Sequence, residues 1–151
     1  MTEWKSVDAI LDFAIENEVN AAKFYRELAT MAKLQHMKQV FEGYACEEDG
    51  HKAKLEHVKA GGQLEKAEIN VMDLKIGDYL VDQKPTPDLD YQGCLILAMK
   101  MEKAAFKLYT DLADATDDPA VKDLLLSLAQ EEAKHKLRFE IEYDDNIYVE
   151  N

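Results

Sequence analysis

Residues 45–51 read ACEEDGH, and residues 129–135 read AQEEAKH. The two stretches lie 84 residues apart, and the same shift aligns further parts of the chain with each other without a gap. A fixed internal offset indicates two copies of one structural unit, each of which needs the other to cover its apolar face. The shift superposes Glu18 on Glu102, Tyr25 on Tyr109, Glu48 on Glu132 and His51 on His135.

Apolar residues recur at helical spacing in four segments, which predicts an all-α chain. The whole sequence holds six Gly and three Pro, and so few turn-forming residues favour long helices. The predicted helices run from about Val7 to Lys33, from Gln35 to Ala60, from Tyr91 to Ala115, and from Asp118-Pro119 to a frayed end near Tyr143-Asp144-Asp145.

Capping residues mark the ends of these segments. Ser6, Asp90 and Asp118 are suited to accept hydrogen bonds at helix N-termini, and Gly61-Gly62 is suited to end the second helix. We expect a single domain over residues 1–151, with one helical hairpin at about 7–60, a second at about 90–143, and a crossover over 61–89. A connection of that length can return along a bundle ~36 Å long, which is the topology of ferritin-like four-helix folds. Within the crossover, residues 71–82 can form a short helix.

The net charge limits the classes of partner. The chain has 18 basic and 31 acidic residues, a net charge of −13, which disfavours nucleic acids and anionic membranes and attracts cations. Two cysteines, Cys46 and Cys94, form no C-x-x-C motif and fit a reducing compartment, where we expect both to be buried thiols. The N-terminus does not resemble a signal peptide, so we expect a cytoplasmic protein.

Four glutamates on the apolar stripes predict a metal site. At 1.5 Å per residue, each of them lies about 20 Å from the loop that joins its own hairpin, and they therefore lie at one level of the bundle. They are Glu18, Glu48, Glu102 and Glu132. Buried carboxylates without partners are costly, and a pair of divalent ions would balance their charge. Two Glu-x-x-His pairs add His51 and His135 on the same helix faces. This oxygen-rich set favours two iron ions, or manganese, with zinc as the weaker alternative.

For the residues around the six predicted ligands, the sequence predicts less specific roles. Tyr25 and Tyr109 lie two turns beyond Glu18 and Glu102, and we favour core packing for both. A hydrogen bond to a ligand, or electron donation, is the alternative that would give these tyrosines a catalytic role. We expect the remaining residues near the site to face solvent or fill the core boundary: Glu16, Glu47, Glu131, His36 and His57 at the surface, and Met99 and Met101 at the boundary.

Taken together, these motifs resemble the di-iron domain of the rubrerythrin family, within the ferritin-like superfamily. They are Ala14-x3-Glu18-x5-Phe24-Tyr25, Glu48-x2-His51, Glu102-x6-Tyr109 and Glu132-x2-His135. The resemblance implies a non-haem di-iron centre, often in a homodimer, that reduces hydrogen peroxide in oxidative-stress defence. It also implies that Glu48 and Glu132 bridge the ions, with Glu18 and Glu102 as terminal ligands.

The chain departs from that family pattern in two ways. It has no rubredoxin domain with paired C-x-x-C motifs, so electrons must come from an external donor. Ala105 stands where rubrerythrins proper carry an extra carboxylate, which places efficient peroxidase action in question. We therefore keep two alternatives to peroxide reduction: a ferroxidase that handles iron with dioxygen, and a metal-binding module without turnover.

Overall fold

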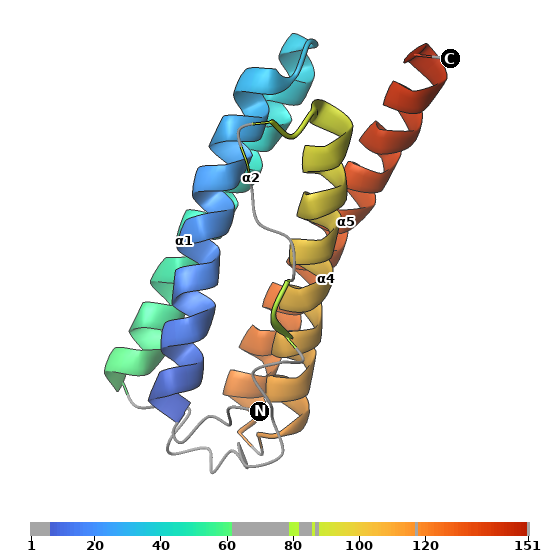
Figure 1. Ribbon diagram of the computed structural model, residues 1–151. Coiled ribbons are helices and arrows are strands. Elements are labelled where there is room, and N and C mark those ends of the chain that lie inside the picture. Colours follow the sequence, from blue (N-terminus) through green and yellow to red (C-terminus); the bar gives the residue numbers. More distant parts are fainter. Residues whose placement is uncertain (1–6, 62–78, 82–85, 87, 117, 151) are drawn as a thin grey trace.

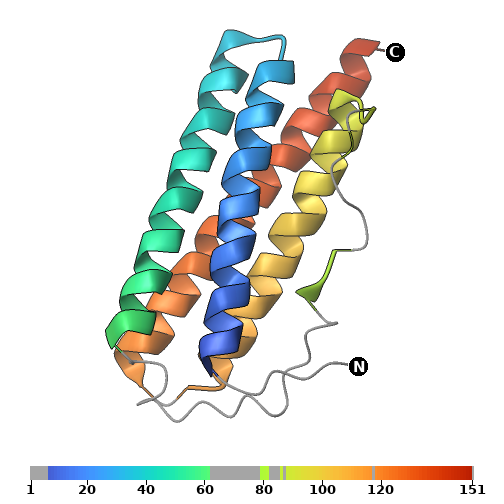
Figure 2. The same cartoon turned by 60° about the vertical axis from the view of Figure 1, so that its left-hand side comes forward.

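The computed structural model describes residues 7–61, 79–81, 86, 88–116 and 118–150, and in this part of the chain it is helical without strands (Figure 1). The helices are α1 (Val7–Met31), α2 (Gln35–Gly61), α4 (Tyr91–Asp114) and α5 (Pro119–Glu150). Helix α1 packs along α2, and α4 packs along α5, so two hairpins form one bundle (Figure 2). The predicted four-helix architecture is confirmed.

The two aspartates predicted to cap α4 and α5 do so. Asp90 Oδ1 accepts a hydrogen bond from the Gly93 backbone N–H at 2.7 Å. Asp118 Oδ1 accepts from the N–H groups of Ala120 and Val121 at 2.9 and 3.2 Å. Each carboxylate satisfies donors that have no partner within the first helical turn, which fixes where α4 and α5 begin.

Helix α5 is longer than predicted. The sequence indicated fraying near Tyr143 to Asp145, but α5 continues to Glu150. Tyr91 on α4 holds the C-terminal half of α5 by donating a hydrogen bond from its hydroxyl to Glu142 at 2.5 Å. A tertiary contact of this kind extends a helix beyond what local composition supports.

Part of the crossover packs on the second hairpin. Tyr79 is buried, and its hydroxyl donates a hydrogen bond to Asp111 on α4 at 2.8 Å. The predicted short helix at 71–82 and the predicted cap at Ser6 lie almost wholly outside the described residues. None of the described helices combines the length and apolar character that crossing a membrane requires.

The apolar core consists of two clusters, one in each half of the bundle. One cluster contains Ile10, Leu11, Leu55, Leu112 and Leu125, together with their neighbours. The other contains Leu28, Met37, Phe41, Leu95 and Phe139, together with theirs. Between the two lies a band of buried polar side chains that includes Glu18, Glu48, Glu102 and Glu132.

Replacing Asp90 by alanine tests the capping. Asp90→Ala should lower the free energy of unfolding by about 1 kcal/mol, because the N–H groups at the start of α4 lose their acceptor. Urea denaturation of the metal-free protein measures the change. Asp88→Ala, an exposed aspartate two residues earlier, is the matched control. Equal effects from the two substitutions would contradict the capping role.

Candidate metal centre

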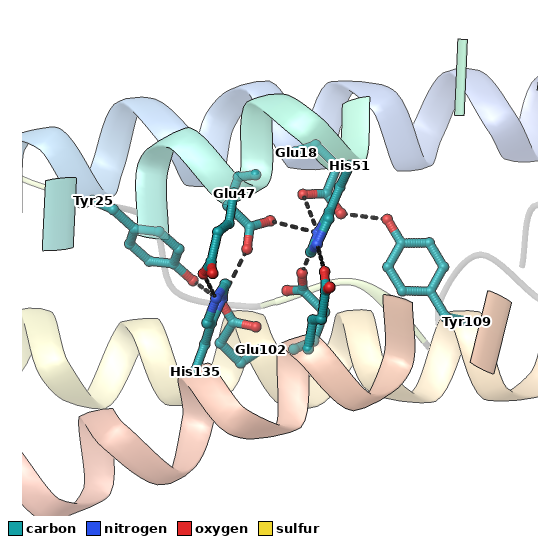
Figure 3. Close-up of polar contacts among 10 residues, drawn as sticks. Glu18, Tyr25, Glu47, His51, Glu102, Tyr109 and His135 are labelled. Carbon is teal, nitrogen blue, oxygen red and sulfur yellow. Dashed lines mark hydrogen bonds and ion pairs between the residues drawn. The ribbon is translucent and has the colours of Figure 1, made fainter. Parts of the chain in front are cut away.

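Six side chains from four helices converge at mid-bundle (Figure 3). Helix α1 supplies Glu18 and α4 supplies Glu102, while α2 and α5 each supply one Glu-x-x-His pair. Each of the six residues is no more than 2% exposed. The structure therefore brings together every residue that the sequence predicted as a ligand: Glu18, Glu48, His51, Glu102, Glu132 and His135.

The cluster divides into two overlapping groups. Glu18, Glu48, His51 and Glu132 form one, with their potential ligand atoms within 4.8 Å of one another. Glu48, Glu102, Glu132 and His135 form the other by the same measure. Glu48 and Glu132 belong to both groups, as two carboxylates bridging a pair of ions would. The arrangement agrees with the bridging and terminal roles that the family resemblance implies.

Each of the six residues directs one buried atom at the centre without a hydrogen-bond partner. These atoms are Glu18 Oε2, Glu48 Oε1, His51 Nδ1, Glu102 Oε2, Glu132 Oε1 and His135 Nδ1. Nδ1 of His51 lies 2.7 Å from Glu132, and Nδ1 of His135 lies 2.9 Å from Glu48, but neither contact has hydrogen-bond geometry. Buried polar groups are normally paired or bound to metal, so the residues fit a pair of divalent cations.

The electrostatics of the metal-free cluster favour proton uptake. Burial, with the neighbouring Glu48, raises the pKa of Glu18 to about 8. Burial also raises the pKa values of Glu102 and Glu132 well above the ordinary value for glutamate. Burial alone would lower the pKa of His51, but Glu132 and the other carboxylates around it raise the pKa overall. Protons and metal ions therefore compete for the same charge-crowded space.

Two further glutamates orient the histidines across the hairpins. Nε2 of His51 donates to Glu131 of the other hairpin, and Nε2 of His135 donates to Glu47 at 2.5 Å. In the neutral imidazole, a proton on Nε2 leaves Nδ1 without one, and Nδ1 faces the carboxylates. Glu131 and Glu47 therefore select the tautomer that can bind metal. The hydrogen bond from His51 also lowers the pKa of Glu131, against the effect of its partial burial.

Glu47 is exposed, as predicted, and Glu131 is half-buried, but the contacts that both make with the histidines were not predicted. Their side chains are 54% and 38% exposed, yet each places a carboxylate oxygen on a buried imidazole. The repeat carried the signal, because the two residues occupy equivalent positions directly before Glu48 and Glu132. Glu16, the third glutamate in that prediction, is exposed as expected.

The tyrosines also cross between hairpins (Figure 3). The hydroxyl of Tyr25 donates to Glu102, and the hydroxyl of Tyr109 donates to Glu18. Both rings are fully buried, and burial, with the nearby carboxylates, raises both tyrosine pKa values well above 10. Each tyrosine therefore fills the core and also donates a hydrogen bond to a predicted ligand. Electron donation by either tyrosine stays a prediction.

The two sides of the centre differ. On the α2–α5 side the rings of His51 and His135 lie 6.4 Å apart and nearly parallel. Tyr44 stacks on His135 with ring centroids 4.0 Å apart. Tyr44 lies one turn before Glu48 on the core-facing stripe predicted for this helix, but the repeat did not single it out, because the equivalent position in the other hairpin is Leu128. On the α1–α4 side, a cavity of about 850 Å³ reaches the carboxylates.

The predictions for the remaining polar and sulfur side chains mostly hold. His36 and His57 are exposed, and Met99 and Met101 are half-buried at the edge of the core. Cys94 is buried as expected, but Cys46 is exposed. The helix geometry explains this: Ala45 and Glu48 face the core, so Cys46 points outward.

The chain has relatives among known families and solved structures. The family model described as Rubrerythrin matches residues 9–143. A ferritin-like diiron-carboxylate protein from Thermotoga maritima superposes with a TM-score of 0.78 at 20% identity, over 97% of this chain and 99% of that one. A hypothetical protein from Pyrococcus furiosus superposes with a TM-score of 0.71 at 24% identity, over 93% and 89%. These similarities show a shared fold. No curated protein matches the chain.

The raised pKa values predict how the stability of the metal-free protein depends on pH. Glu18 binds its proton more tightly when folded, so the stability from that proton is full below pH 4.5 and is lost as the pH rises through about 8. His51 acts with the same sign. We expect the Tm of metal-free protein to fall between roughly pH 5 and 8.5.

Calorimetry on chelator-treated protein measures this trend. Glu18→Gln should flatten the slope, whereas Glu16→Gln, on the exposed face of the same helix, should change it only as any lost surface charge would. Saturating dication should reverse the trend, because metal binding displaces protons and strengthens with pH. A Tm that rises with pH in the absence of metal would contradict the proposed charge crowding.

Removing Glu131 should weaken metal binding while leaving all six ligands in place. Glu131→Ala is expected to raise the Kd for Mn²⁺ by about 10–100-fold, because the His51 imidazole loses the partner that fixes its tautomer. Competition with a metal-responsive dye measures the affinity. Glu42→Ala, an exposed glutamate on α2, is the control, and equal Kd values for the two variants would refute the orienting role.

Proposed function

The chain belongs to the rubrerythrin family, and from that membership we propose that it is a non-haem di-iron oxidoreductase that reduces hydrogen peroxide. The observation that supports this most is the set of six unpartnered ligand atoms in two groups that share Glu48 and Glu132. Four carboxylates and two imidazole nitrogens are a donor set suited to iron, with manganese and zinc as alternatives. The structurally similar Thermotoga maritima protein is itself described as a diiron-carboxylate protein.

The chain's own residues would hold and insulate the ions. Glu18 with His51, and Glu102 with His135, would each serve one ion, and Glu48 with Glu132 would serve both. When bound, a reduced iron pair supplies two electrons and Lewis acidity toward a peroxide oxygen. The apolar clusters on either side exclude water, and the histidines close the α2–α5 side.

Tyr25 and Tyr109 would act on the terminal carboxylates in this proposal. Each tyrosine keeps its proton and donates a hydrogen bond from the hydroxyl, Tyr25 to Glu102 and Tyr109 to Glu18, so one oxygen of each terminal glutamate is occupied. The other oxygen of each is the unpartnered atom that faces the centre. The tyrosines would therefore orient Glu18 and Glu102, and the cavity on the α1–α4 side would leave room for a substrate. Electrons would come from an external donor, and a homodimer is the expected assembly.

Iron oxidation by dioxygen is the second candidate function. The net charge of −13 concentrates cations around the bundle, which suits a protein that takes up ferrous ion as substrate. The two functions differ in oxidant. Peroxide reduction requires a faster reaction with hydrogen peroxide than with dioxygen, and iron handling requires the reverse.

Stopped-flow mixing of the anaerobic protein, loaded with two Fe²⁺ per chain, with hydrogen peroxide tests the proposal. We expect oxidation at least ~100-fold faster than that of free Fe²⁺, because bound iron held at a preorganised site reacts without assembling its ligands. Glu48→Ala should abolish the fast phase, since it removes a ligand of both ions. Glu56→Ala, exposed on the same helix, should retain it.

Three results would overturn the proposal. Oxidation no faster than for free Fe²⁺ would remove the peroxidase function, and a faster reaction with dioxygen would favour ferroxidase action. An unchanged Tm after Glu48→Ala, together with no turnover in the wild type, would indicate a site that retains its residues without the activity.

A further inference from the structure

The cavity between α1 and α4 has the internal symmetry of the chain. Its α1 wall includes Ala21 and Phe24, and its α4 wall includes Ala105 and Leu108, which are the equivalent positions after the 84-residue shift. The terminal glutamates and both tyrosines also line it as equivalent pairs. The cavity therefore follows the line between the two hairpins and ends on the carboxylates that face its interior.

The cavity is much larger than hydrogen peroxide requires. Its volume is about 850 Å³, whereas one water occupies about 30 Å³ of the liquid and hydrogen peroxide has only one oxygen atom more. The α1 residues that line it extend from Phe13 to Glu27, a length of roughly 21 Å at 1.5 Å per residue. Ligand pockets for organic molecules typically measure about 300–1,000 Å³. The cavity has the size and the elongated shape of such a pocket.

Small apolar residues create this space. Ala21 and Ala105 stand one helical turn after Glu18 and Glu102, and Ala104 lies beside Ala105 on the α4 wall. Phe24, Leu108 and Met101 add apolar surface near the carboxylate end. Polar α1 residues and part of the crossover also line the cavity, among them Asn17, Asn20, Lys23, Tyr79 and Thr86. A carboxylate at position 105 would have added a charge and filled part of the volume. The alanine leaves an apolar wall next to the reactive centre.

We propose that this cavity binds an organic hydroperoxide, ROOH, with its apolar R group between α1 and α4 and its peroxide oxygens at Glu18 and Glu102. The inference rests on the proposed function for the reaction and on the cavity for the substrate class. A neutral hydroperoxide loses no charge hydration when its R group enters between the apolar residues of the cavity.

The reaction balances as a two-electron reduction. The O–O bond of ROOH breaks, and two electrons and two protons convert it to the alcohol ROH and water. The electrons are those of the reduced metal pair of the proposed function, replenished by its external donor, and the protons come from solvent. The apolar walls act only in binding, by removing the R group from water.

Binding to the metal-free protein tests the cavity separately from the chemistry. Cumene hydroperoxide is the probe, and an NMR titration gives its Kd. Ala105→Phe should weaken binding at least tenfold by filling the cavity, and Ala104→Phe provides a second variant on the same wall should the first misfold. Ala53→Phe, the same substitution at an exposed position on α2, should bind as the wild type does. Circular dichroism confirms that each variant is helical.

The iron-loaded protein then gives kcat/KM for cumene hydroperoxide and for hydrogen peroxide. We expect Ala105→Phe to lower kcat/KM for cumene hydroperoxide, relative to kcat/KM for hydrogen peroxide, at least tenfold, because only the larger substrate needs the cavity. No binding by the metal-free wild type, or equal binding by the Ala105→Phe and Ala53→Phe variants, overturns this inference even if hydrogen peroxide is reduced. If binding depends on Ala105 but neither peroxide is reduced, the binding site is supported and the proposed function is refuted.

Discussion

The burial of four carboxylates at one level of an apolar bundle is the constraint on which the rest of the structure depends. Leaving one ionised carboxylate unpaired in such surroundings costs on the order of several kcal/mol, and here four share one space. The apolar clusters above and below the four glutamates keep water from reaching them along the bundle axis. The cluster must therefore take up protons or bind cations, and its unpartnered oxygen and nitrogen atoms are arranged for cations.

The same charged band holds the two hairpins together. Tyr25 reaches Glu102, Tyr109 reaches Glu18, His51 reaches Glu131, and His135 reaches Glu47, and each of these hydrogen bonds joins one hairpin to the other. Equivalent residues make equivalent bonds, so the contacts follow the approximate twofold symmetry of the repeat. The centre is thus both the polar part of the hairpin interface and the place where chemistry would occur. Loss of one of these bonds would loosen the packing and the ligand geometry together.

The centre is enclosed on one side and accessible on the other. On the α2–α5 side the imidazoles stand between the carboxylates and solvent, with Tyr44 stacked on His135. On the α1–α4 side the terminal glutamates line a cavity bordered by alanines and larger apolar residues. The two sides of the site therefore differ: the imidazoles and their carboxylate partners lie on the α2–α5 side, and the cavity lies on the α1–α4 side.

The sequence by itself determined the helices, the repeat and the six converging residues. It could do so because helical periodicity and a constant offset are local properties: Glu48 and His51 share a face whatever the helix packs against. Only the tertiary structure decided which residues pair across the hairpins. Whether Glu131 faces water or His51, and whether Tyr25 ends on Glu102, depends on the rotation and separation of helices distant in sequence. The cavity beside Ala105 has the same origin, since it is set by packing between elements, which no local pattern encodes.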